Sequence, residues 1–276
     1  MSTVFTWDKK DMEYLLASCE TDGILPYIEK YMPKPATLLE SGCGLGRYVK
    51  YLSDRGWDVT GLEINGDAVE MVKKQWPELK VVEGDAANSP FKANTFDGII
   101  SLGVIEHWTD GPSAPIKDIY RTLKPGGVAL ITTPCVNTVR KFKKLTWWYE
   151  LENKHSRKQW LSNKGPKPNR LNKGYKFFTH PAYGDFFEYR FTKNEFRDAV
   201  EGAGLEVIEH GPSAVIDGFY HDLNPHQKLV SFKNWRFYPT RTGAIANKLL
   251  SIFPYFHPHM QIIIARKPVA KPKKKV

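Results

Sequence analysis

Three glycines at alternate positions follow a short apolar run near the start of the chain. Gly42, Gly44 and Gly46 come directly after Ala36–Glu40, which reads ATLLE, and a helical pattern begins behind them. Glycines let the backbone turn sharply and let a ligand approach it closely. The helix start would add free N–H groups and the positive end of a dipole. Alone, the pattern fits either a nucleotide site or a plain turn between a strand and a helix.

Two acidic residues follow the next two apolar runs. Glu63 ends the run Asp58–Glu63, and Asp85 follows the run Leu79–Glu83. A carboxylate in the first position can accept hydrogen bonds from both hydroxyls of a ribose, and one in the second can accept from the amino group of an adenine. Each could instead be a solvated strand end or an Asx turn. Because successive parallel strands end at one edge of a sheet, their joint occurrence predicts a nucleoside site.

A dinucleotide site is disfavoured by the spacing of the glycines. The G-x-G-x-x-G fingerprint would place its third glycine at position 47, which is Arg47.

Short apolar runs alternate with helical patterns from residue 36 to residue 134. One or two helices are predicted within residues 4–31, ahead of the first run. The strands predicted are 36–40, 58–63, 79–83, 96–102, 128–133, 205–209 and 261–265, and the helices between them 46–55, 67–75, 115–123 and 192–202. Lys124–Gly127 is predicted as a turn, and residues 211–258 as irregular. Because most of the strands are apolar throughout, the pattern is typical of an α/β fold with a mostly parallel, Rossmann-like sheet and helices on both faces.

Five successive segments resemble those of class I S-adenosylmethionine-dependent methyltransferases. They read ESGCGLGRY, VTGLEIN, VVEGDAANSPF, FDGIISLGVIEHW and LKPGGVALITTP. The branch that looks most similar acts on small molecules, as in ubiquinone biosynthesis. The resemblance covers about residues 36–134, with weaker support from 188–210 and 260–266.

The resemblance implies S-adenosylmethionine as cofactor and assigns residues to its parts. Glu40 and the three glycines would lie along the methionine, and Ser101 and Leu102 would meet its end. Glu63 would hold the ribose hydroxyls, Ile64 would pack on the adenine, and Asp85 and Ala86 would contact the ring. Glu40 and Glu63 stand where many relatives have Asp, and the longer side chain can do the same work. The pair Glu106–His107 also matches the family.

Methyl transfer from a sulfonium is an in-line displacement, for which alignment of the two reactants matters most. Neither a metal nor a covalent intermediate is needed, so no metal site is expected. A general base is needed only for an acceptor that arrives protonated. His107 is the best-placed candidate for that role, and it could equally be a structural histidine at a helix start. Other candidates in or near the basic segment are His155, His180, Tyr183 and Tyr189.

The net charge of +10 is concentrated in one internal segment. Residues 137–176 hold twelve Lys or Arg, two Glu and six aromatic residues, and the end of the chain, 267–276, holds five lysines. The interpretation is one domain over 36–266, preceded by a helical segment over 1–35 and followed by a basic, disordered tail. An insertion over 137–190, after the fifth strand, would serve as a lid that grips the acceptor through Arg, Lys and Trp.

Three kinds of acceptor fit this pattern. A small molecule, acidic or partly aromatic, is the first hypothesis, with the methyl group going to an O, N or C atom. RNA is an alternative, because basic residues interleaved with aromatics suit phosphates and bases. A lipid at a membrane surface is another, since 248–264 (KLLSIFPYFHPHMQIII) are apolar. The preferred interpretation of that stretch is a last helix and strand within the core.

Composition and cysteine content narrow the class of protein. With 41% hydrophobic and 25% charged residues, the chain is typical of a globular protein. It has no apolar run of transmembrane length and no pattern of a secretory signal. Cys19, Cys43 and Cys135 are too widely spaced for a disulfide framework or a metal site, which predicts a cytoplasmic location.

Overall fold

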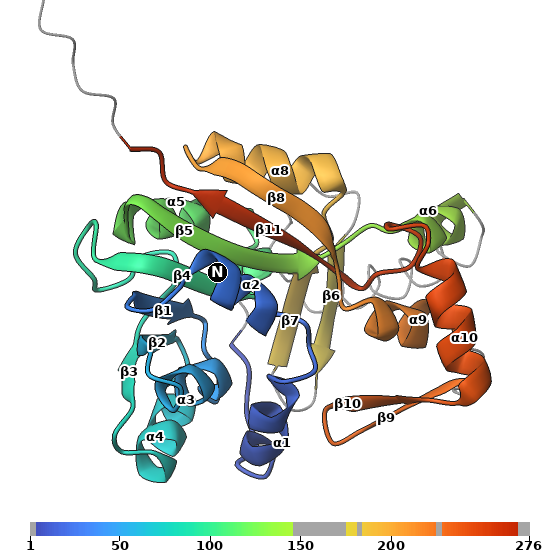
Figure 1. Ribbon diagram of the computed structural model, residues 1–276, viewed down its shortest axis with the longest axis horizontal. Coiled ribbons are helices and arrows are strands. Elements are labelled where there is room, and N and C mark those ends of the chain that lie inside the picture. Colours follow the sequence, from blue (N-terminus) through green and yellow to red (C-terminus); the bar gives the residue numbers. More distant parts are fainter. Residues whose placement is uncertain (1–3, 146–174, 181–183, 225–227, 270–276) are drawn as a thin grey trace, which may run out of the picture.

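A seven-stranded sheet forms the centre of the molecule (Figure 1). The computed structural model describes residues 4–145, 175–180, 184–224 and 228–269. The sheet has the order β3-β2-β1-β4-β5-β11-β8. Its strands are β1 (Thr37–Ser41), β2 (Asp58–Glu63), β3 (Lys80–Glu83), β4 (Phe96–Leu102), β5 (Leu123–Pro134), β8 (Glu206–Ser213) and β11 (Met260–Arg266). Strands β1 to β5 are parallel, and β11 runs antiparallel to β5 and β8, so the mostly parallel fold predicted from the sequence is confirmed.

Helices cover both faces of the sheet because neighbouring residues of each strand point to opposite sides. Leu38 packs in one cluster with α2 (Leu25–Tyr31) and α3 (Arg47–Ser53), whereas Leu39 packs in a second cluster with α5 (Ser113–Thr122) and α8 (Lys193–Gly202). The other helices of this part are α1 (Asp11–Ser18), α4 (Gly66–Gln75) and the short 3₁₀ helix η1 (Ile105–His107). Helix α8 begins with the predicted capping box, in which Thr192 and Glu195 each cover a free N–H group.

The predicted turn at Lys124–Gly127 is wrong, because these residues belong to β5. The strand already pairs with β4 at Leu123, opposite Phe96. The next pair is Gly98 with Val128, so the intervening residues form a bulge. Gly126 permits this bulge with a φ of +83°.

Residues 211–258 are not irregular as predicted. They form α9 (Val215–Leu223), the hairpin β9 (Val230–Lys233) and β10 (Arg236–Pro239), and α10 (Arg241–Leu250). The hairpin reverses through Asn234 and Trp235, both with positive φ. Glycine is the usual sequence signal for such a turn, and neither position has one. Within the apolar stretch 248–264, β11 lies in the core and residues 257–258 are buried, whereas the end of α10 and the turn after it are exposed.

The predicted insertion contains regular structure at its start and at its end. Helix α6 (Thr138–Leu145) follows β5, and the hairpin of β6 (Tyr175–His180) and β7 (Gly184–Tyr189) comes before α8. Residues 146–174, which include most of the basic charge, lie outside the described residues, as do residues 270–276 of the expected tail. Lys267 at the start of that tail is buried and donates to the carbonyl oxygens of Tyr120 and Leu123. Among the described helices, none is both long and apolar enough to cross a bilayer.

Candidate functional site

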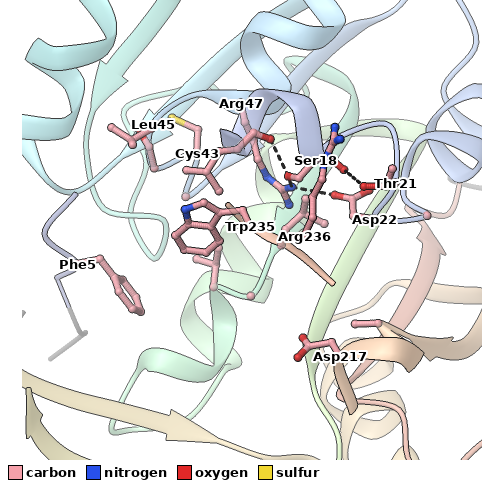
Figure 2. Close-up of a pocket in the computed structure, with 18 of the residues that line it drawn as sticks. Phe5, Ser18, Thr21, Asp22, Cys43, Leu45, Arg47, Asp217, Trp235 and Arg236 are labelled. Atoms are coloured by element: carbon pink, nitrogen blue, oxygen red, sulfur yellow. Dashed lines mark hydrogen bonds and ion pairs between the residues drawn. The ribbon is translucent and has the colours of Figure 1, made fainter. Parts of the chain in front are cut away.

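A cavity of about 1100 Å³ opens at the carboxyl ends of β1 and β4. This is the point where the chain order in the sheet reverses, with β2 on one side of β1 and β4 on the other, and ligands commonly bind there in parallel sheets. Its walls come from several segments. They are the N-terminal segment with Phe5 and Trp7, residues 15–23, the glycine loop (residues 42–46), the residues after β2, β3 and β4, and residues 214–238 (Figure 2).

The glycine loop is packed tightly on two sides. Gly42 and Gly44 have φ values of +78° and +54°, which favour glycine. A Cβ atom on Gly42 would lie 2.5 Å from a methyl group of Val104, and one on Gly44 would lie 2.7 Å from the indole of Trp7. Gly46 has a φ of +69° and starts α3, although it does not line the cavity. The loop therefore presents bare backbone to the cavity, in a conformation that larger residues would distort.

Glu40 is a buried acid beside the glycine loop. Its Oε2 accepts a hydrogen bond from the N–H of Val49 at 3.0 Å. Burial raises the pKa of Glu40 to about 8, although the nearby Arg47 guanidinium opposes the shift. Arg47 forms an ion pair with Asp22 at 2.9 Å and donates to Ser18 at 2.7 Å, and all four residues line the cavity (Figure 2). This end of the cavity therefore combines one buried acid with a paired charge.

Glu63 is tied into the backbone around the loop. Its two carboxylate oxygens accept from Gly44 N–H at 2.8 Å and from Asn65 N–H at 3.0 Å. Burial raises its pKa, and these amide hydrogen bonds work against the rise. The side chain does not line the cavity, whereas the neighbouring Ile64 does. A carboxylate can accept about four hydrogen bonds, so Glu63 keeps acceptor capacity beyond these contacts.

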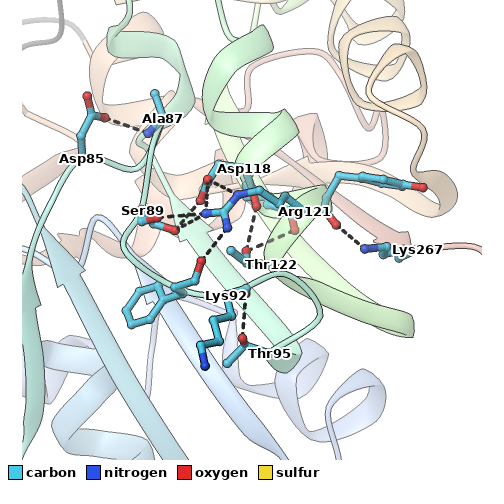
Figure 3. Close-up of polar contacts among 12 residues, drawn as sticks. Asp85, Ala87, Ser89, Lys92, Thr95, Asp118, Arg121, Thr122 and Lys267 are labelled. Carbon is cyan, nitrogen blue, oxygen red and sulfur yellow. Dashed lines mark hydrogen bonds and ion pairs between the residues drawn. The ribbon is translucent and has the colours of Figure 1, made fainter.

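The loop after β3 brings one of its two predicted residues to the cavity. Ala86 lines the wall, whereas Asp85 does not, because its Oδ1 accepts from the N–H of Ala87 at 2.7 Å (Figure 3). Arg121 of α5 fixes the rest of this loop. It donates to the carbonyl and hydroxyl oxygens of Ser89 and to the carboxylate of Asp118 (Figure 3). Asp85 thus forms the Asx turn that was one of its two interpretations.

The segment after β4 also reaches the cavity. Leu102 and His107 line it, whereas Ser101 lies behind the wall, and its buried hydroxyl has no hydrogen-bond partner among the described residues. The His107 ring packs edge-on against Phe5, with ring centres 5.0 Å apart. Its Nε2 lies 3.9 Å from Oε1 of Glu106, a buried acid whose pKa burial raises well above its usual value. The histidine is therefore largely enclosed.

The wall opposite the glycine loop carries a second histidine. His221 and Asp217 lie four residues apart on α9, and the carboxylate contacts His221 Nε2 at 3.1 Å. Both residues line the cavity, and the His221 side chain is 51% exposed. Sequence analysis missed this pair, because 211–258 had been interpreted as irregular. The i, i+4 spacing of an acid and a histidine was the available signal.

Helix α9 is supported from behind by the start of the predicted insertion. Arg140 forms a buried ion pair with Asp222 at 2.9 Å and lies 2.7 Å from Nδ1 of His259. The His259 ring in turn lies 5.0 Å from that of His221. Residues 137–142 and 188–190 do not line the cavity themselves. Residues 146–174 lie outside the described residues, so a grip on the acceptor by 137–190 stays a prediction.

The two ends of the cavity differ in chemistry. Near the glycine loop, the buried carboxyl group of Glu40 suits a ligand with cationic and hydroxyl groups. At the other end the wall is aromatic, with a histidine and an acid among the rings. It contains Tyr220, His221, Phe232, Trp235, Phe237 and Tyr238. The arrangement can hold a polar ligand and an apolar or planar one beside each other.

Comparison with known proteins gives a consistent result. Residues 39–131 match the family described as "Methyltransferase domain". A malonyl-[acyl-carrier protein] O-methyltransferase from Enterobacter lignolyticus is 27% identical over 127 residues, which cover 46% of this chain and 49% of that protein. A Homo sapiens protein described as "Probable tRNA methyltransferase 9B" is 33% identical over 129 residues, covering 46% of this chain and 25% of that protein. The match thus spans about half of the first relative and a quarter of the second.

The likeness in structure extends further than the likeness in sequence. A protein from Methanosarcina mazei, described as belonging to the SAM-dependent methyltransferases, superposes with a TM-score of 0.59. The superposition covers 89% of this chain and 98% of that one, at 20% identity. The shared fold therefore includes regions outside residues 39–131.

Proposed function

Since the chain contains a class I S-adenosylmethionine-dependent methyltransferase domain, we propose that it methylates a small-molecule acceptor held in the cavity between the glycine loop and residues 214–238. The methyl group would go to an O, N or C atom of an acidic or partly aromatic compound. The observation that carries the proposal is the cavity itself. It places a glycine loop and a buried acid at one end and an aromatic wall at the other.

The residues at the glycine loop fit this cofactor. Gly42 and Gly44 line the cavity with backbone alone, and a Cβ atom at either position would collide with Val104 or Trp7. The buried carboxyl group of Glu40 suits a ligand that carries positive charge. The indole Nε1 of Trp7 is buried without a hydrogen-bond partner among the described residues, and Trp7 lines the same cavity. It could donate to a bound ligand.

Each residue at this end would have a defined task. When bound, S-adenosylmethionine supplies an electrophilic methyl group. Although its side chain lies outside the cavity lining, Glu63 would accept from the ribose hydroxyls through its remaining acceptor positions. Glu40, Gly42, Gly44 and Leu102 would lie along the methionine. Ile64 and Ala86 would pack against the adenine. Gly46, Asp85 and Ser101, which do not line the cavity, would act through the backbone that they position.

A hydroxyl acceptor would need a base, and the cavity offers two histidines. His107 is enclosed by Phe5 and Glu106. His221 is more accessible, and the carboxylate of Asp217 at 3.1 Å can orient its ring. We therefore favour His221 over His107 as the group that takes the proton from such an acceptor.

The test of the proposal is cofactor binding by Glu63 variants. Glu63→Ala should weaken binding of S-adenosylmethionine about tenfold or more in titration calorimetry, because two hydrogen bonds to a charged group are lost. Glu63→Gln keeps the size of the side chain and should weaken binding less. Asp58→Ala is the matched control, since Asp58 begins the same strand and is exposed. An absence of saturable binding to the unaltered protein, or equal affinity in all variants, would contradict the proposal.

RNA is a second candidate acceptor, since the human relative is described as a tRNA methyltransferase and 137–176 are strongly basic. RNA binding that falls steeply with salt, and that occupies the acceptor end of the cavity, would favour it.

A cytoplasmic location is our further inference. Its support is that Cys19, Cys43 and Cys135 are all free and buried.

A further inference from the structure

Helix α10 and the turn after it present an apolar stripe to solvent. Ile245, Leu249, Ile252 and Phe253 have exposed fractions of 55%, 59%, 71% and 64%. Their spacing of four, three and one residues places them along one side of a helix. Three backbone hydrogen bonds continue the helical turn beyond Leu250, from the N–H groups of residues 251, 252 and 253. The stripe is therefore a fixed feature of a folded element.

The opposite side of α10 is fixed to the rest of the protein. Gly243 packs so closely that a Cβ atom there would lie 2.2 Å from the carbonyl oxygen of Leu229. Asn247 contacts Nε2 of His257 through its side-chain oxygen at 2.9 Å. The helix lies at the edge of the molecule, away from the central sheet (Figure 1). These contacts hold the helix in one orientation, with the apolar stripe outward.

The segment that carries the stripe is basic. Residues 223–265 contain five Lys or Arg and no Asp or Glu, although the neighbouring helix α9 carries Asp217 and Asp222. Arg241 and Lys248 lie on α10 itself and are exposed. Helix α6 adds Lys141 and an exposed Phe142, and it lies beside the end of α10, since Val139 N–H donates to the carbonyl of Phe256 (Figure 1). An apolar stripe in a positive field matches an anionic surface with an apolar interior.

We propose that α10 and its following turn dock the protein on the surface of an anionic lipid membrane, with Leu249, Ile252 and Phe253 inserted among the lipid chains. Other occupants fit these features less well. A second copy of the chain would bring one basic face against another. RNA would use the basic residues but not Leu249 or Ile252, because aliphatic side chains cannot stack on bases.

The docking surface is joined to the candidate active site by a short stretch of chain. The hairpin β9–β10 lines the cavity through Phe232, Trp235 and Tyr238, and α10 begins two residues after β10 ends. A docked molecule would therefore hold the aromatic end of the cavity near the lipid surface. An acceptor embedded in the membrane, or attached to a lipid, could reach the cavity without passing through bulk water.

Flotation of the full chain with vesicles tests this proposal. Vesicles of phosphatidylcholine with phosphatidylglycerol should carry the protein, and vesicles of phosphatidylcholine alone should carry much less. The double variant Leu249→Gln/Ile252→Gln keeps every charge and should lower the partition coefficient about tenfold or more. Ile208→Gln, on exposed β8, is the matched control and should bind as the unaltered protein does. Thermal unfolding and cofactor titration should be unchanged in all variants.

Several results would overturn the proposal. It would be overturned if the unaltered protein failed to float with the anionic vesicles, or if the double variant floated as well as the control. A dimer seen by sedimentation velocity and lost in the double variant would make a second copy the occupant. RNA binding that is lost in the double variant would make RNA the occupant. Because cofactor titration is measured on the same samples, failure of docking is distinguished from failure of the proposed function.

Discussion

At the scale of single residues, Glu40 shows how burial sets protonation. Its carboxyl group is fully enclosed, and burial raises its pKa to about 8 from an ordinary value of 4.5. Between these values the folded protein keeps a proton that the unfolded chain has lost. The contribution of Glu40 to stability is therefore complete at acid pH and is lost as the pH rises through about 8.

We expect the free energy of unfolding of the ligand-free protein to fall between about pH 5 and about pH 8, with a contribution of about 2–4 kcal/mol from Glu40. Glu40→Gln stays neutral at every pH and keeps an acceptor for Val49, so its stability should fall less over this interval. Urea unfolding at several pH values measures the difference. Glu78→Gln, which changes an exposed acid, should leave the slope unaltered. Equal slopes for Glu40→Gln and the unaltered protein would contradict the assignment.

Several of the predicted site residues lie at the cavity because a strand end determines their place, whereas their roles stay predictions. The glycines, Glu40, Ile64, Ala86, Leu102 and His107 come directly or shortly after strands, and apart from Gly46 all of these line the cavity. Asp85 shows the limit, because a short acid can bond to its own backbone and turn away from the site. The sequence did not place Trp7 and His221 at the cavity, since they lie in segments distant in sequence from the strand ends that form it.

At the scale of elements, α9 determines what the far wall of the cavity contains. The helix carries Asp217 and His221, and it lies against the backbone of residues 257–259. Gly218 makes this approach possible, since a Cβ atom there would lie 1.7 Å from the carbonyl oxygen of His257 and 2.5 Å from the N–H nitrogen of His259. The position of His221 therefore depends on a residue without a side chain.

Gly218→Ala should destabilise the protein by about 1–3 kcal/mol, because the added methyl group forces α9 away from its neighbour. Hydrogen exchange should become faster in α9, whereas affinity for S-adenosylmethionine should change little, since the glycine loop is at the opposite wall. Gly211→Ala is the control, as a Cβ atom there meets nothing within 4 Å. If both variants unfold at the same urea concentration, the contact with residues 257–259 is not what holds α9.

Elements were predicted well where local pattern and burial agree. The buried strands of the central sheet and the capping box of α8 have strong local signals. The hairpin β9–β10 and α10 were missed because their exposed faces carry apolar residues such as Phe232, Leu249 and Ile252. Such residues remove the polar alternation by which surface elements are recognised.

At the scale of the whole molecule, two segments far apart in the sequence meet at the cavity. The N-terminal segment contributes Phe5 and Trp7, and residues 214–238 form the opposite wall. Arg236 of β10 connects the two, because it donates to the carbonyl oxygen of Ala17 in α1 at 2.8 Å. No pattern within either segment could predict this contact, since its partners are more than two hundred residues apart.

Arg236→Ala should loosen the hairpin from α1. We expect faster hydrogen exchange in β9 and β10 and a loss of about 1–2 kcal/mol of stability, as for a hydrogen bond from a charged donor. Arg241→Ala removes the same side chain from an exposed position just beyond the hairpin and should have neither effect. Unchanged exchange in the Arg236 variant would show that other contacts hold the wall.

The position of Trp7 has a consequence for the timing of binding. Its indole lies directly over Gly44, and Asn65 holds the same segment by donating to the carbonyl oxygen of Phe5. A ligand that contacts Gly44 from this side must first displace the indole. The indole must move aside again before that ligand can leave. Residence time would then be governed by motion of the first residues of the chain, so two ligands of equal affinity would exchange at a similar, slow pace.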